Sequence, residues 1–460
     1  ILFHHMRGEL DNLVRLYKQC GGGEGMTGDK IKQSIAAYLI ACPVYRYYGK
    51  DIPFMTQDEN SNNEELFKFY QRAMQFSGPL MAKGVEDTLM YTYNRFIGHN
   101  EVGDAPQAFG FSAEKFHELM QYRQKHWPLS LNTTSTHDTK RGEDARARLN
   151  ALTDFYEEWM TLVRKWMMAN GSLKMKGLPD GNDEYFIYQT LVATYPYLSG
   201  GRDAGNRMED GKQSAVESYS QRIQEYLQKA LREAKVHSNW AAPNADYEHA
   251  TIQFARSLIK GENDFHKTFI PFQQKISDYG IINSLSQLLL KFTCPGIPDT
   301  YQGTELWDLS LVDPDNRRPV DYTSRKRLLA GGKPFHELWE ARMNGNIKLA
   351  LLHQLLKIRI SYPDIFSDGE YIPLQIGGEF KNNAMAFFRS YKGKNMLVAI
   401  PLHLNQLSDN LPGADWRDTK IILPSGYNSK WEDKLKGSVV NDVYLNDVFQ
   451  KFPLALLIGQ

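Results

Sequence analysis

The stretch "PLSLNTTSTHDTKRGEDARARL", residues 128–149, decides how this chain is expected to fold. Leu129 and Leu131 alternate with polar residues, and the threonines that follow keep the preference for β structure, which predicts a strand. The acidic residues of "GEDARARL" predict the first turn of a helix, in which Asp144 and Arg148 are spaced to form an ion pair. The order strand, turn, helix is typical of an α/β fold.

A histidine and an aspartate, His137 and Asp138, stand side by side where the predicted strand ends. In a (β/α)8 barrel, polar residues at the carboxyl ends of strands face the active site. The alternative interpretation makes Asp138 a cap of the following helix and His137 a surface residue. No second histidine or cysteine stands nearby at ligand spacing, so no metal site is expected.

The composition bounds the class of protein. With 42% hydrophobic and 23% charged residues, the 460-residue chain is an ordinary globular protein with room for two domains. Basic and acidic residues balance at 54 each, so no nucleic-acid partner is expected. Three cysteines without a CxxC pair predict a reducing, cytoplasmic location, and the lack of an apolar run of about 18 residues predicts no membrane span. The opening "ILFHHMRGEL" has neither an initiator methionine nor a signal-peptide pattern, so we expect the chain to begin within a longer protein.

The texture of the sequence changes near residue 366. Before it, helical periodicities dominate, most strongly over about residues 155–290. After it, short strand-like runs are split by glycine, asparagine, aspartate and proline. The pattern predicts an α/β domain over residues 1–365 and an all-β module over residues 366–460.

A second polar cluster lies in "PGIPDTYQGTELWDLSLVDPDNRRPVDY", residues 295–322. Its glycines and prolines favour a tight, irregular backbone, on which Tyr301, Gln302 and Glu305 are polar groups. A structural loop is the alternative interpretation for each residue taken singly. The chain has no GxSxG and no GxxxxGK[ST] motif, which disfavours a serine hydrolase and a P-loop nucleotide hydrolase.

Together the two clusters resemble a known family. "TSTHDTKRGEDARARL" is similar to the strand-seven segment of the α-amylase superfamily, in the form found in maltooligosyltrehalose synthases, and residues 295–322 are similar to its strand-eight segment. "GPLMAKGVEDT", "NEVGD", "PVYRYY" and "REAKVHSNW" resemble the family as well, from near residue 30 to about residue 330. The superfamily's nucleophilic aspartate after strand four and its acid/base glutamate after strand five have no counterpart here. The resemblance therefore implies the C-terminal part of a catalytic (β/α)8 barrel with large helical insertions, followed by a C-terminal β-sandwich.

The resemblance also implies a reaction. The family converts the reducing-end α-1,4 linkage of a maltooligosaccharide into the α,α-1,1 linkage of trehalose, with the chemistry of a retaining glycosidase. Asp138 matches the superfamily's third carboxylate, a transition-state stabiliser that grips sugar hydroxyls beside the reacting carbon. The other candidates are expected to bind substrate: His137, Lys83, Arg46, Arg141, Glu86, Asp87, Tyr301, Gln302 and Glu305. Glu86 and Asp87 stand where a helix is expected to begin, so helix capping stays open for them.

The expected activity is that of an isomerase, an intramolecular glucosyl transferase of trehalose biosynthesis. It is expected to act on maltooligosaccharides beside a trehalose-releasing hydrolase, without a cofactor. The isolated chain is expected to be inactive. Two alternatives stay open: a non-catalytic α-glucan-binding fragment, and a hydrolytic glycosidase of the α-amylase type.

Overall fold

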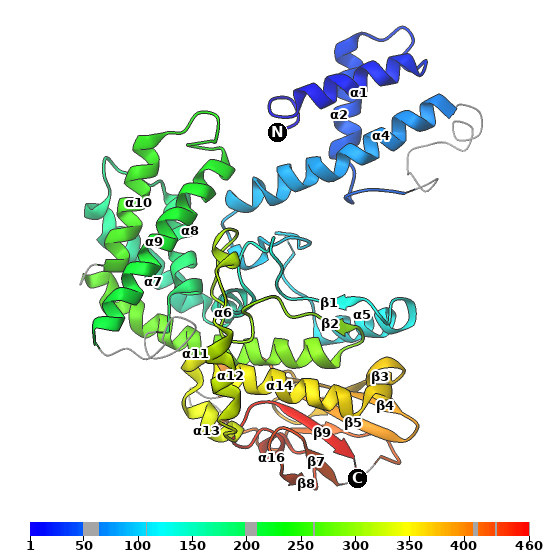
Figure 1. Cartoon of the computed structure of the whole chain (residues 1–460), viewed down its shortest axis with the longest axis vertical. Coiled ribbons are helices and arrows are strands. Elements are labelled where there is room, and N and C mark those ends of the chain that lie inside the picture. The colour runs from blue at the N-terminus through cyan, green and yellow to red at the C-terminus, as the bar shows by residue number, and fades with distance from the viewer. Residues whose placement is uncertain are drawn as a thin grey trace. The chain divides into compact units, whose positions relative to one another are not determined.

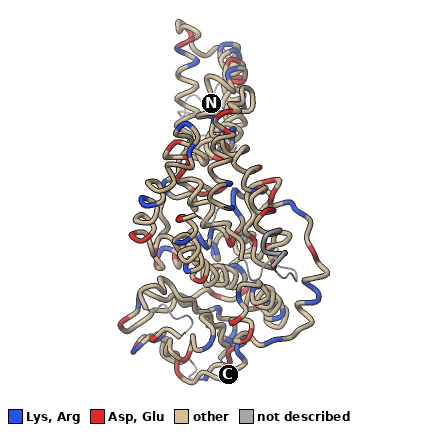
Figure 2. Tube along the Cα trace, turned by 90° about the vertical axis from the view of Figure 1, so that its left-hand side faces the viewer, with Lys and Arg blue, Asp and Glu red and all other residues tan. Residues whose placement is uncertain are grey.

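A computed structural model describes residues 1–48, 64–106, 108–197, 209–260, 263–407, 413–427 and 430–459 of the chain. The polypeptide divides into two units, the first built from Ile1–Arg95 and Lys229–Ala245, the second from Phe96–Gln228 and Asp246–Gln460. Lys and Arg residues are interspersed with Asp and Glu along the trace, as the equal counts lead one to expect (Figure 2). None of the described helices is long and apolar enough to cross a membrane.

The first unit packs helices around a small apolar core (Figure 1, blue). These helices are α1 (Arg7–Gln19), α2 (Gly28–Ile40) and α4 (Glu64–Met81). Apolar positions one turn apart bury Leu10 and Leu13 of α1 against a cluster that includes Ile31 of α2 and Phe69 of α4. Burial of one face of each helix stabilises this unit, since short helices are marginal alone.

The second unit carries most of the described helices. They are α5 (Ala113–His126), α6 (Glu143–Asp154), α7 (Tyr156–Ala169), α8 (Gly181–Thr194), α10 (Ala245–Lys260), α11 (Asp264–Thr293), α12 (Tyr322–Ala330), α13 (Phe335–Glu340), α14 (Asn346–Ser361) and α15 (Pro363–Ser367), while α9 (Glu209–Ala234) runs into the first unit. Helix α11 packs on α6, where a Cβ on Gly280 would lie 2.8 Å from Arg148 Cα. A glycine is thus required for this close approach. Aromatic rings join α7, α8 and α11, with Trp166 5.0 Å from Phe265 and 5.4 Å from Tyr188 between ring centroids.

Two short strands position the candidate site. Strand β1 (Leu131–Asn132) pairs in parallel with β2 (Ile297–Pro298), so that Leu131 lies opposite Ile297. The chain leaves β1 through a turn and enters α6 at Glu143, which confirms the predicted order strand, turn, helix. Parallel strands need a long crossover, and helices α6 to α11 provide it. The described residues contain no other parallel pair of named strands, so the eight-stranded barrel stays a prediction.

The C-terminal region forms an antiparallel sheet (Figure 1, orange to red). Its strands are β3 (Glu370–Gly377), β4 (Ala384–Tyr391), β5 (Lys394–Pro401), β6 (Lys420–Ile422), β7 (Trp431–Asp433), β8 (Val439–Val440) and β9 (Ala455–Gly459), and α16 (Leu445–Val448) precedes the last of them. They are ordered β6-β3-β4-β5-β9-β7-β8. The predicted β-rich module is confirmed, but the described strands form one curled sheet rather than two facing sheets. The reason is the last strand, β9, which pairs with both β5 and β7 and so joins all strands into one sheet.

Arg389 of β4 ties this sheet to the helices. Its guanidinium, 1% exposed, donates to the carbonyls of Thr293 (3.4 Å), Ile365 (3.2 Å), Phe366 (3.2 Å) and Gly369 (2.9 Å). The carbonyls of Thr293, Ile365 and Phe366 lie in the last turns of α11 and α15, where helices leave acceptors unpaired, and Gly369 follows α15. Burial lowers the pKa of Arg389 to about 10. One buried side chain therefore caps two helix ends.

Candidate active site

The turn between β1 and α6, residues 133–142, carries His137 and Asp138 and is named the His–Asp turn. Thr139 Oγ1 donates to the Thr136 carbonyl (2.9 Å), and the Asp138 N–H donates to Thr136 Oγ1 (3.1 Å). Both His137 and Asp138 are exposed. Threonines that the sequence indicated only as β formers are therefore the residues that bend the chain.

Asp138 is not the cap of α6. The N-cap residue is Gly142, which offers no side-chain bond. A capping Asp138 would accept hydrogen bonds from the N–H groups of Lys140 and Arg141. These groups instead donate to Glu101, at 2.7 Å and 3.2 Å. Among the described residues, no side chain or N–H group donates to the Asp138 carboxylate. The capping interpretation is wrong, and the carboxylate faces solvent.

The carbonyl side of the His–Asp turn is held by Asn316, which comes from the second polar cluster. Asn316 Nδ2 donates to the carbonyls of His137 (3.0 Å) and Thr136 (3.5 Å). Asn316 is buried in the short 3-10 helix Asp315–Arg317. The two sequence clusters that carried the resemblance are thus in direct contact.

The carboxyl ends of β1 and β2 meet at Thr133 and Asp299, where Thr133 Oγ1 donates to Asp299 Oδ2 (3.3 Å). The approach depends on Gly296, whose φ is +125° and whose added Cβ would lie 2.6 Å from the Ser130 carbonyl. Asp299 is an exposed carboxylate. Asp299 is not among the predicted site residues, although its place after a predicted turn-rich segment at a strand end was a usable signal.

The residues predicted on the second cluster differ in exposure. Gln302 is exposed and Tyr301 is half-buried. Glu305 lies 2.8 Å from Arg325 Nε, and the same guanidinium donates to the Gly303 carbonyl (2.8 Å). Glu305 is therefore engaged in holding its own turn, whereas Gln302 stays open to a ligand.

Arg141 is buried rather than presented at the surface. With 1% exposure, its guanidinium donates to the carbonyls of Ile97 (3.2 Å) and Asn100 (3.4 Å) and to the Tyr226 hydroxyl (3.1 Å). This position leaves Arg141 no surface for a sugar, and the residue anchors the end of the His–Asp turn instead.

Charged side chains at the start of α6 are buried as a group. Glu143 Oε1 and Asp144 Oδ2 each lie 2.7 Å from Lys348 Nζ of α14, and Glu143 Oε2 lies 3.4 Å from Lys291 Nζ of α11. Thr134 Oγ1 donates to Glu143 and so links this group to the His–Asp turn. Two carboxylates and two ammonium groups balance one another inside the protein.

The two carboxyl groups of this set differ in pKa. Burial opposes the ionisation of Glu143, but Lys348 and Lys291 outweigh burial and lower its pKa to about 2. Burial raises the pKa of Asp144 to about 6; Lys348 opposes this, and the charge of Glu143 adds to it. For Lys348, burial is outweighed by Asp144 and Glu143, which raise the pKa of the ammonium group.

The predicted ion pair between Asp144 and Arg148 is wrong. Asp144 turns to Lys348, and Arg148 donates to the carbonyls of Val192 (3.3 Å) and Tyr195 (2.7 Å). The spacing suits a pair on an exposed helix face. Both residues are buried, so tertiary partners decide their contacts instead.

The first unit holds Lys83, Glu86 and Asp87 on one turn. The backbone leaves α4 through a π-helical turn, Ala82–Glu86, a feature that is frequent at functional sites. Lys83 Nζ pairs with Asp87 at 2.5 Å, and the buried Glu86 accepts a bond from the Tyr45 hydroxyl. One turn thus carries all three predicted residues, with Lys83 and Asp87 paired to each other and Glu86 bound to Tyr45.

The prediction that Glu86 and Asp87 begin a helix is wrong. They end the helical segment that starts with α4. The carboxyl end of a helix disfavours negative charge, so the partners of these residues offset that cost. Arg46, also in the first unit, is exposed and places its guanidinium 4.8 Å from the ring centre of Tyr48.

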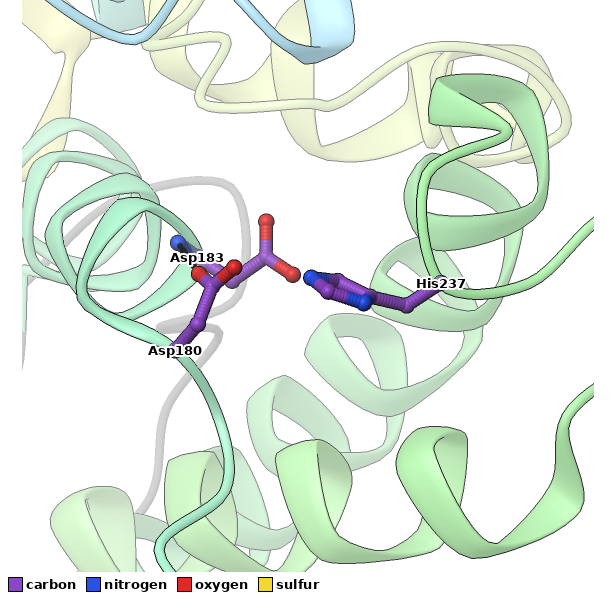
Figure 3. Close-up of side chains that lie close together, drawn as sticks. All are labelled: Asp180, Asp183 and His237. Atoms are coloured by element: carbon purple, nitrogen blue, oxygen red, sulfur yellow. Dashed lines mark hydrogen bonds between the residues drawn. The ribbon is translucent and has the colours of Figure 1, made fainter.

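A further acidic pair stands at the start of α8 (Figure 3). Asp180 is the N-cap and accepts the Asp183 N–H at 2.9 Å, and the Tyr247 hydroxyl donates to Asp183 at 2.7 Å. The figure also draws His237, which belongs to the first unit. Within the second unit, both aspartates have a structural task at the helix start.

Comparison with known proteins identifies the family. No protein-family model matches the chain. A putative maltooligosyl trehalose synthase of Mycobacterium tuberculosis is 32% identical over 388 residues, which are 84% of this chain and 45% of that protein. The solved maltooligosyltrehalose synthase of Arthrobacter ramosus has a TM-score of 0.79 at 28% identity, over 99% of this chain and 56% of its own. The chain belongs to the maltooligosyl trehalose synthase family.

A second solved structure supports the assignment. A hypothetical maltooligosyl trehalose synthase of Sulfolobus tokodaii has a TM-score of 0.73 at 30% identity, over 98% of this chain and 58% of its own. The resemblance drawn from the His–Asp turn and the second cluster is confirmed. The chain spans about half the length of the maltooligosyl trehalose synthases that it matches.

Proposed function

We propose that this chain carries part of the active site of an enzyme that converts the reducing-end α-1,4 linkage of maltooligosaccharides into the α,α-1,1 linkage of trehalose. The observation that carries the proposal is that the Asp138 carboxylate is exposed and does not cap a helix. This carboxylate is exposed on the turn that follows a parallel strand, and Glu101 accepts the N–H groups that a capping Asp138 would bind. Relatives named for this activity cover most of the chain.

The proposed chemistry is that of a retaining glycosidase, which proceeds in two steps. First, a carboxylate attacks the anomeric carbon while a carboxylic acid protonates the oxygen of the terminal glucose that leaves. Then the anomeric hydroxyl of that glucose attacks the same carbon, the carboxylate leaves, and the conjugate base takes the proton. Water must be excluded between the steps, because it would otherwise hydrolyse the intermediate. The two reacting carboxyl groups are not assigned to residues of this chain.

The proposed task of Asp138 is to accept hydrogen bonds from hydroxyls beside the reacting carbon. Such bonds strengthen as the ring approaches an oxocarbenium-like transition state, so they lower the barrier. His137 is proposed to bind the same sugar, with Gln302 and Tyr301 at the neighbouring turn. In the first unit, Lys83, Arg46, Glu86 and Asp87 are proposed as further sugar contacts. We propose that Arg141 and Glu305 hold loops instead, because their side chains are engaged by protein groups.

The architecture proposed for the whole enzyme follows from the parallel pair. Strands β1 and β2 are proposed to belong to a (β/α)8 barrel, of which residues 1–365 form the C-terminal part with helical insertions, and residues 366–460 form the module that follows. Cys20, Cys42 and Cys294 are free, which supports a cytoplasmic location. The partner would be a hydrolase that releases trehalose.

The test is an analysis of products from maltopentaose. The full-length protein is expected to consume reducing ends without shortening the chain, since the linkage moves and no bond is hydrolysed. Shortened maltooligosaccharides as the main products would identify a hydrolytic amylase instead. Binding of maltopentaose without turnover would identify a glucan-binding protein. The 460-residue chain by itself is expected to give no turnover.

A further inference from the structure

Glu101 binds the backbone of the His–Asp turn from outside that turn. Its Oε1 accepts the Lys140 N–H at 2.7 Å, and its Oε2 accepts the Arg141 N–H at 3.2 Å. Oε1 also accepts the N–H of the neighbouring Val102 (2.9 Å). Glu101 is 4% exposed, so these N–H groups replace water around a buried carboxylate.

Arg146 connects the other end of the turn to the same carboxylate. Arg146 Nε lies 3.6 Å from Glu101 Oε2, and another nitrogen of the guanidinium donates to the Thr134 carbonyl. Thr134 precedes the His–Asp pair and Lys140 follows it. The ion pair of Glu101 with Arg146 therefore joins both ends of the turn.

These bonds fix the turn rather than the helix behind it. A helix leaves the N–H groups of its first turn unpaired, and those groups lie after the N-cap, Gly142. Lys140 and Arg141 lie before it. Glu101 thus binds the backbone of the turn in a conformation in which no group of the described residues donates to the Asp138 carboxylate.

We propose that Glu101 is a positioning residue, which sets the place of the Asp138 carboxylate through the turn and does not touch the substrate. The inference rests on the proposed function of Asp138. Asn316 holds the carbonyl side of the turn, and without Glu101 the N–H groups of Lys140 and Arg141 lose the acceptors that hold the other side. A displacement of about 1 Å at a reacting group lowers the rate by up to about a hundredfold. The Glu101 bonds are therefore expected to matter for the rate more than for substrate affinity.

The test compares Glu101→Gln with Glu184→Gln in the full-length protein. Glutamine has almost the size of glutamate but only one acceptor oxygen, so one bound N–H group loses its acceptor. Glu184 is a matched control, since it is buried in α8 and pairs with Lys174 at 2.6 Å. Both variants are expected to lower the melting temperature, because each removes a charge from an ion pair. Only Glu101→Gln is expected to lower kcat, by about tenfold or more, with KM changed by less than about threefold.

Two further measurements separate positioning from simple loss of structure. Hydrogen exchange at the Lys140 and Arg141 amides is expected to accelerate in Glu101→Gln and to stay unchanged in Glu184→Gln. In an Asp138→Asn background, Glu101→Gln is expected to lower kcat almost no further, because its effect passes through Asp138.

An unchanged kcat in Glu101→Gln overturns the proposal, and so does a loss that persists in full in the Asp138→Asn background. Wild-type activity of the single Asp138→Asn variant overturns the proposed function instead. That variant therefore shows which of the two ideas has failed.

Discussion

Lys348 of α14 holds its ammonium group 2.7 Å from Asp144 Oδ2 of α6, and both side chains are 1% exposed. The same ammonium group reaches Glu143, which Thr134 binds from the His–Asp turn. Surface ion pairs contribute little to stability, but removing one partner of a buried pair leaves an uncompensated charge. The buried carboxylates that contact the His–Asp turn therefore depend on a lysine more than 200 positions away in the sequence.

Replacing that lysine by a residue of similar length tests this dependence. Lys348→Met is expected to lower the free energy of unfolding by about 3–5 kcal/mol, since two buried carboxylates would share Lys291 alone. Urea unfolding followed by circular dichroism measures the change. The matched control is Lys267→Met, at an exposed pair with Asp264, for which we expect no measurable change in the free energy of unfolding. Equal effects of the two substitutions would contradict a special role for the buried group.

The pKa of Asp144 predicts a pH dependence of stability. Its folded-state pKa, raised by burial to about 6 from 3.8, means that the folded protein holds this proton more tightly than the unfolded chain. Protonated Asp144 therefore adds to the free energy of unfolding. This contribution, on the order of 3 kcal/mol, is present in full below about pH 4 and is lost as the pH rises through 6. Asp144→Asn is expected to remove this slope, as measured by urea unfolding between pH 4 and pH 7.

Glu143 supplies the internal contrast, because its folded-state pKa is lowered to about 2 from 4.5. Its contribution is present above about pH 4.5 and is lost as the pH falls toward 2. Glu143→Gln is therefore expected to flatten the acid side of the stability profile, and Asp144→Asn the side near pH 6. If either substitution removed the same pH dependence of the unfolding free energy, the two carboxyl groups would not titrate separately, and this prediction would be wrong.

Asp138→Asn in the full-length protein tests the central residue. The substitution keeps the size of the side chain and removes the charge. The melting temperature is expected to stay nearly unchanged, because the carboxylate is exposed and no described group donates to it. The rate of trehalose-linkage formation is expected to fall by at least about a hundredfold, on the order of 3 kcal/mol of transition-state stabilisation. Near-wild-type activity would remove Asp138 from the proposed site.

Arg389→Lys tests the junction between the sheet and the helices. A lysine lacks the planar fork that lets one guanidinium reach the carbonyls of Thr293, Ile365, Phe366 and Gly369. Buried acceptors left unpaired are expected to cost roughly 2–4 kcal/mol of unfolding free energy. Arg417→Lys, at an exposed pair with Glu379, is the control and should leave the free energy of unfolding unchanged within the error of the measurement.

The sequence predicted those parts of the fold that depend on interactions between residues close together in the chain. The alternation at Leu129 and Leu131 and the acidic start of "GEDARARL" predicted the strand, the turn and the helix, and all three are present. The change of texture near residue 366 predicted the β module. Both signals work because strand alternation and helix-start charge act within a few residues.

Other features depend on partners far away in the sequence. Lys348 stands among leucines in "IKLALLHQLLKIRI", a pattern that does not reveal that Glu143 and Asp144 meet it inside the protein. Glu86 and Asp87 were expected at a helix start because acidic residues favour it, yet α4 continues into the π-helical turn. The single curled sheet depends on where β9 pairs, which the strand pattern alone does not specify.

The pairing of β1 with β2 predicts an order of folding events. Thr133 and Asp299, at the ends of these strands, are 166 positions apart. Contacts between distant parts of a chain form slowly, because the intervening loop must lose entropy before the contact compensates for it. Helices α6 to α11, which lie between the strands, can gain structure through local contacts first. The His–Asp turn should therefore reach its final structure late. During refolding, helical content should recover before the binding of sugar does.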